Sequence, residues 1–70
     1  MALDKTSLEY QFMAEYFKLM REYWEPQPEQ IWWDKFHEAL NQLASKYDNT
    51  FAIEHLALFA HLQEKKGGKI

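Results

Sequence analysis

The stretch TFAIEHLALFAHL, from Thr50 to Leu62, constrains most strongly how this 70-residue chain can fold. It contains one carboxylate, Glu54, and no lysine or arginine. At about 100° per residue of an α-helix, its apolar residues occupy two sides of the helix. A helix of this kind is either the centre of a small bundle or meets a second chain.

One side of this helix is expected to face the core, and it holds Ala52, Ile53, Leu56, Ala57, Phe59 and Ala60. The other side, named here the second apolar face, recurs at i, i+4, i+7 and i+11 and holds Phe51, His55, Leu58 and Leu62. These four residues are either internal, held by the other helices and the N-terminal segment, or a candidate interface. We favour the interface, because one short chain leaves Phe51, Leu58 and Leu62 too few partners.

Two further helices are predicted before this one. Thr6 followed by Glu9 fits a capping box, and a broad apolar face then extends over a helix of about residues 7–24. Pro26 ends that helix, and Pro28 is suited to be the first residue of the next, which has one apolar stripe over about residues 28–47. Asn49 or Thr50 is expected to cap the third helix, about residues 51–66.

These elements predict an all-α fold with a single domain over residues 1–70. The first two helices form an antiparallel hairpin, because the connection at Pro26 and Pro28 is short and stiff, and the third helix packs across it. Residues 1–6 are expected to be a lead-in, and residues 67–70 a flexible tail after Gly67 and Gly68.

The composition argues for a partner. The chain is 47% hydrophobic and 17% aromatic, which excludes a disordered chain. A domain this small buries only about 60% of its unfolded surface, so we expect more large side chains than a monomer can hide. The prediction is a homodimer or a dedicated protein partner.

Aromatic residues concentrate around the first turn. The interpretation that gives them a function is a slot for a ligand cation, a proline-rich peptide or a sugar. The structural interpretation, which we favour, is that they close one end of the core. The cluster is Tyr23, Trp24, Trp32, Trp33 and Phe36.

The chain offers few candidates for catalytic or metal-binding residues. Cysteine is absent, so thiolate metal sites and disulfides are excluded. His55 and His61 are six residues apart and point in different directions, and His37 lies on the polar side of its helix, so no helical zinc pair is expected. The hydroxyls of Thr6, Ser7, Ser45 and Thr50 fit caps or surface positions. We therefore predict no enzyme, no metal and no cofactor.

The charge balance of the chain argues against direct nucleic-acid binding. The net charge is −3, from 11 acidic and 8 basic residues, and basic residues cluster only at Lys65, Lys66 and Lys69. Nucleic-acid binding proteins usually carry a basic stripe, so direct binding is not expected. The turn at Asp48 still leaves an alternative, a helix-turn-helix type regulator acting as a dimer.

The leading prediction is a small, non-enzymatic protein-binding or oligomerisation module. No apolar run is long enough to span a membrane, and the N-terminus shows no export signal, so a cytoplasmic location is expected. Short, acidic, cysteine-free helical chains are common among phage and mobile-element accessory proteins, which suggests that origin without any motif to support it.

Overall fold

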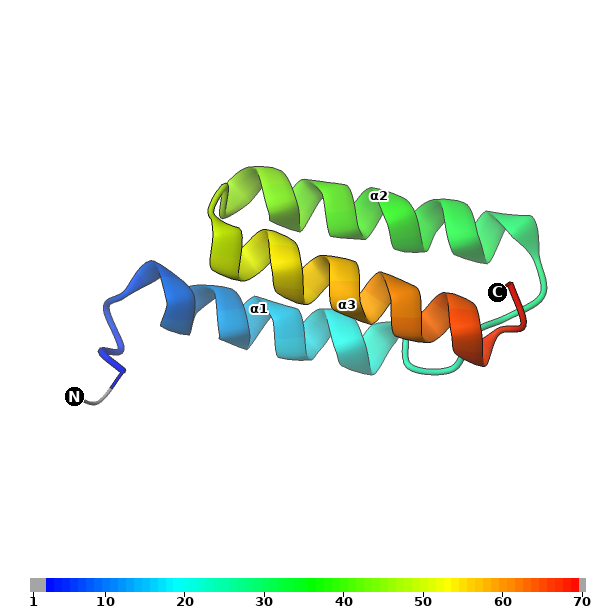
Figure 1. The fold of residues 1–70 in the computed structure, drawn as a ribbon, viewed down its shortest axis with the longest axis horizontal. Helices are drawn as coiled ribbons and strands as arrows, with labels where there is room; N and C mark the ends of the chain where they lie inside the picture. The colour runs from blue at the N-terminus through cyan, green and yellow to red at the C-terminus, as the bar shows by residue number, and fades with distance from the viewer. Residues whose placement is uncertain (1–2, 70) are drawn as a thin grey trace.

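The computed structural model describes residues 3–69 and contains three α-helices (Figure 1). These are α1 (Leu8–Glu22), α2 (Gln30–Lys46) and α3 (Thr50–Lys66). α1 and α2 form an antiparallel hairpin, and α3 returns parallel to α1 and packs lengthwise against both. The bundle measures 41 × 20 × 19 Å. The predicted all-α three-helix fold is confirmed.

The start of α1 differs from the prediction. Ser7 is the N-cap, and its hydroxyl oxygen accepts a hydrogen bond from the Tyr10 N–H at 3.2 Å. Thr6 instead donates both its backbone N–H and its hydroxyl to the Asp4 carboxylate, each at 2.9 Å. The prediction of Thr6 as the capping residue was wrong, because Asp4 forms a local turn that takes up both Thr6 donors.

The connection between α1 and α2 is longer than predicted. α1 ends with Tyr23 as its C-cap, so Trp24 lies outside the helix. Glu29, with ψ 135, is the extended N-cap of α2, and the prediction that Pro28 begins this helix was wrong. Proline fixes only its own φ and leaves the next residue free to be extended. For α3, Asn49 is the cap, and its side chain accepts from the Ala52 N–H at 2.9 Å.

α3 ends in a Schellman motif at the two glycines. The Lys69 N–H donates to the Glu64 carbonyl at 2.8 Å, and the Gly68 N–H to the Lys65 carbonyl at 3.2 Å. Gly68 has φ 77, the left-handed conformation this motif requires. Gly67 sits against Trp33, since a Cβ there would lie 2.7 Å from Trp33 Cζ2. Residue 70 and residues 1–2 of the predicted tail and lead-in lie outside the described range.

One core extends along the bundle where the three helices meet. Phe12 and Phe36 are fully buried. Phe12 stacks on Tyr16 at 5.1 Å and meets the edge of Tyr47 at 5.6 Å, so aromatic rings join α1 to the end of α2. The core comprises Phe12, Tyr16, Leu19, Trp33, Phe36, Leu40, Leu43, Tyr47, Ala52, Leu56 and Phe59.

The buried side of α3 is rotated from the predicted one by about 50°. Ile53 is 45% exposed and Ala57 is also exposed, although both were expected in the core. The buried residues are Ala52, Leu56, Phe59 and Gln63. The rotation turns α3 toward its second apolar face, so that face lies partly against α1.

We predict that Phe12→Ala lowers the free energy of unfolding by about 3–5 kcal/mol, because it leaves a cavity among the aromatic rings at the centre of the core. Urea denaturation followed by circular dichroism measures this loss. Ile31→Ala is the control, since Ile31 is 64% exposed and its removal should change stability by less than about 0.5 kcal/mol. A loss below about 1 kcal/mol for Phe12→Ala would contradict the assigned core.

Candidate protein-binding face

The broad apolar face predicted for α1 divides into a buried half and an exposed half. Phe12, Tyr16 and Leu19 are buried. Phe17 is 60% exposed and Trp24, just past the helix, is 53% exposed. The exposed half holds Met13 and Phe17. The half-buried Met20 lies on the same side of the helix, and Trp24 follows just past the helix end.

The second apolar face of α3 also divides. Phe51 and His55 are half-buried at its N-terminal end, where the Phe12 and Phe51 ring centroids are 5.9 Å apart. The His55 Nδ1 donates to the Phe51 carbonyl at 2.7 Å, because a carbonyl can only accept. Farther along, Leu58 is 54% exposed and Leu62 is 49% exposed.

The exposed halves of the two helices lie side by side. Tyr16 faces α3, and its hydroxyl donates to the His55 carbonyl at 2.9 Å. Glu15 marks the opposite side of α1, where it bonds Tyr47 and Lys46 of α2. Met20 lies about 40° beyond Tyr16, away from α2. On α3, Leu58 and Leu62 follow His55 and lie within about 60° of it around the helix, on the side away from α2. We name the resulting surface the α1/α3 face: Met13, Phe17, Met20, Trp24, Leu58 and Leu62.

Two side-chain clamps hold α1 and α3 in a fixed register. The Tyr16 bond to His55 spans 39 residues. Near the other end, the Gln63 carboxamide donates to the Tyr23 and Trp24 carbonyls. The bond to Trp24 is 2.9 Å long and also joins residues 39 positions apart. Residues 39 apart in α1 and α3 are therefore level along the parallel helices.

Gln63 is the residue that sequence reasoning missed. It is only 2% exposed and is the one buried polar side chain of residues 3–69. It satisfies carbonyls that the end of α1 leaves without helical partners. Its spacing could have predicted its burial, because Gln63 continues the core-facing stripe of Ala52, Leu56 and Phe59.

Trp24 is fixed on the α1/α3 face by α3. Its ring stacks over Phe59, with centroids 6.4 Å apart. The Lys66 ammonium lies 4.4 Å from the Trp24 ring centroid and donates to the Trp24 carbonyl at 2.9 Å. With this cation–π contact and the Phe59 stack in place, Trp24 is still 53% exposed.

The other four members of the predicted aromatic cluster come together around Trp32. Its ring lies 5.6 Å from Tyr23, 4.7 Å from Trp33 and 5.2 Å from Phe36. Trp33 and Phe36 are buried and Tyr23 and Trp32 are half-buried. They pack as the end of the core, whereas Trp24 stacks on Phe59 instead.

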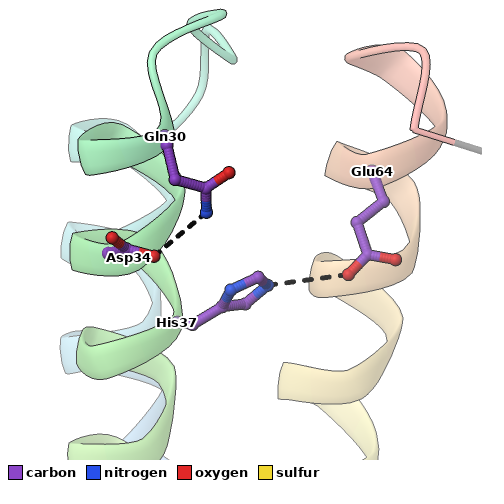
Figure 2. Close-up of polar contacts among 4 residues, drawn as sticks. All are labelled: Gln30, Asp34, His37 and Glu64. Atoms are coloured by element: carbon purple, nitrogen blue, oxygen red, sulfur yellow. Dashed lines mark hydrogen bonds and ion pairs between the residues drawn. The ribbon is translucent and has the colours of Figure 1, made fainter.

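The side of the bundle between α2 and α3 is polar at the end near His37 and Glu64 (Figure 2), while Ile53 and Ala57 leave apolar surface exposed farther along it. His37 Nε2 lies 3.6 Å from Glu64 Oε1, an ion pair when the imidazole is protonated. On α2 itself, the Gln30 amide donates to Asp34 at 3.0 Å. Across the part of the chain that the structure describes, no group of three His, Asp or Glu side chains is arranged to hold a metal ion.

A third polar network joins α1 to α2. The Tyr47 hydroxyl donates to the Glu15 carboxylate, and Lys46 Nζ lies 2.9 Å from the same oxygen. The Tyr47 hydrogen bond, and then the Lys46 contact, lower the pKa of Glu15. This network anchors the hairpin on the side away from the α1/α3 face.

Comparisons with protein-family models, with curated proteins and with solved structures find no match for this chain. Within residues 3–69, no helix has the length and apolar character needed to cross a membrane.

We predict that Gln63→Leu lowers the free energy of unfolding by about 1–3 kcal/mol, because it leaves the Tyr23 carbonyl at the end of α1 without its donor. Urea denaturation measures the change. Gln42→Leu on the exposed side of α2 is the matched control and should change stability by less than about 0.5 kcal/mol. Equal stability of Gln63→Leu and wild type would show that the clamp contributes nothing.

The lowered pKa of Glu15 makes stability depend on pH. Its contribution is present above the unfolded-state pKa, near 4.5, and is lost as the pH falls through the lower folded-state pKa. We predict that the urea midpoint of the wild type falls more between pH 7 and pH 3 than that of Glu15→Gln. Parallel pH profiles for the two proteins would contradict the assigned network.

Proposed function

We propose that this protein is a non-enzymatic, cytoplasmic module that works by binding protein through its α1/α3 face, as a homodimer or an accessory subunit. The observation that carries the proposal is an apolar surface built from two helices, on which Phe17, Trp24 and Leu58 are each more than half exposed. Contiguous exposed apolar surface rimmed by polar residues marks an interaction site.

The size of the face supports this proposal. Aromatic side chains carry about 150–250 Å² each, so Phe17 and Trp24, 60% and 53% exposed, alone leave roughly 200 Å² of apolar surface in water. Removing such surface from water contributes roughly 25 cal/mol per Å², before the entropy of association is subtracted. A partner that covers the face therefore has enough apolar contact to offset part of that cost.

The composition of the face favours a polypeptide as its ligand. It combines a tryptophan, a phenylalanine, two methionines and two leucines along parallel helices. Aromatic residues and methionine are enriched in protein interfaces, and a helix pair offers the shape into which another helix packs. The outward side of α2 is different, since it carries Asp34, Glu38, Asn41 and Gln42.

The nucleic-acid alternative gains no specific support. α2 and α3 lie alongside each other as an antiparallel pair (Figure 1), whereas helix-turn-helix readers set their two helices at about 90–120°. Lys66 and Lys69 lie over the rings of Trp24 and Trp33 at 4.4 and 5.1 Å. Two of the three tail lysines are thus engaged with the protein itself.

Site-specific photo-crosslinking in the native cell tests the proposal. We predict that p-benzoylphenylalanine at position 58 gives crosslinks to a polypeptide, either this chain or another, at least about fivefold above the same probe at position 31. Both native side chains are exposed, Leu58 at 54% and Ile31 at 64%, so Ile31 controls for exposure alone. Equal labelling at the two positions would refute the α1/α3 face as a binding surface.

A further inference from the structure

We propose that the occupant of the α1/α3 face is a second copy of this chain, packed antiparallel about a two-fold axis that crosses α1 near Met20 and α3 near Phe59. This inference rests on the proposed function and adds the identity and orientation of the partner. It follows from the fixed register between α1 and α3 and from the charges beside the face.

Two symmetric ways of pairing the face are possible. A two-fold axis perpendicular to the helices places α1 on α1 and α3 on α3 of the second copy, with the helices antiparallel. A two-fold axis along the helices places α1 on α3, with the helices parallel. A closed dimer requires the same patch on both copies to be self-complementary, so the positions of the side chains decide between these arrangements.

The apolar residues on the two helices share one centre. On α3, the midpoint between Leu58 and Leu62 is level with Ala60. On α1, the 39-residue register places Met20 level with residue 59 of α3. Antiparallel pairing thus sets Leu58 opposite Leu62 of the second copy and, about the same axis, Met20 beside Met20 of the second copy.

The charges beside the face share this centre as well. Glu54 and Lys65 are both exposed, and at eleven residues apart they lie within about 20° of each other around α3. Their midpoint falls between Phe59 and Ala60. Antiparallel pairing therefore brings Glu54 of each copy to Lys65 of the other, which makes two opposite-charge pairs. The parallel arrangement leaves Lys65 level with Pro26, past the end of α1.

The α1/α3 face is also large enough for a standard protein interface. A standard protein interface buries about 800 Å² on each partner, which is about 15% of the 5190 Å² accessible surface of this chain. One long side of a bundle of three helices supplies an area of this order. Face-to-face pairing would give a six-helix assembly whose centre is two facing layers of two helices each, α1 and α3 from each copy.

Sedimentation equilibrium of the purified full chain, with charge exchange, tests the inference. The wild type should sediment as a dimer of twice the 8.5 kDa chain mass. Glu54→Lys alone or Lys65→Glu alone places like charges opposite each other twice, and should raise the dimer Kd by about tenfold. The double variant Glu54→Lys with Lys65→Glu restores opposite charges and should return to within about threefold of wild type. Circular dichroism confirms that each variant is folded.

Disulfide trapping gives an independent readout, since the chain has no cysteine. A mixture of Leu58→Cys and Leu62→Cys proteins should form the mixed disulfide under mild oxidation in preference to either symmetric one. Ile31→Cys should give only slow, concentration-dependent crosslinking.

A monomer at all concentrations would overturn the second copy as occupant, as would a dimer that the charge exchange does not rescue. Crosslinks from position 58 to a different chain, with a monomeric purified protein, would keep the proposed function while refuting this inference.

Discussion

The alignment of α1 with α3 is the constraint on which the other features of this molecule depend. Tyr16 fixes it at one end by donating to the His55 carbonyl, and Gln63 fixes it at the other by donating to the carbonyls after α1. Both bonds join a side chain to a backbone group, so they specify position along the helix axis, which apolar packing alone leaves less well defined. A buried amide such as Gln63 loses its partners if the helices slide, and that loss is costly. The neighbouring apolar side chains are thereby held in a single arrangement.

A domain of this size has little apolar material to spare, and this one places a substantial part of it outside the core. The core takes Phe12, Phe36 and Phe59 from the three helices and closes around them. Phe17 and Leu58 remain half exposed or more on one side of the bundle. Beside α2 lie the polar pairs from Glu15 to Lys46 and from His37 to Glu64, together with the exposed Ile53 on the α3 side. The α1/α3 face thus holds the two most exposed aromatic side chains of residues 3–69, Phe17 and Trp24.

Sequence reasoning succeeded where one physical rule acts alone. The single stripe of α2 is predicted by periodicity, and Trp33, Phe36, Leu40 and Leu43 are buried as that pattern requires. It failed where two local options compete, as at Thr6, which bonds to Asp4 instead of capping α1. For the candidate site, periodicity identified the exposed Leu58 and Leu62, but it could not show that Phe51 and His55 lie half-buried against Phe12 and Tyr16.

By itself the sequence determined the number of helices, their approximate limits and the excess of apolar side chains, because turn residues and helical periodicity act over a few positions. Only the tertiary structure decided which apolar side of α1 and α3 is buried. Both helices carry apolar residues over more than one side, so local pattern offers two nearly equal choices. The choice is made by contacts between residues about 39 positions apart, at Tyr16 with His55 and at Gln63 with Trp24. Those contacts rotate α3 toward α1 and bring the remaining apolar side chains of both helices together on one face.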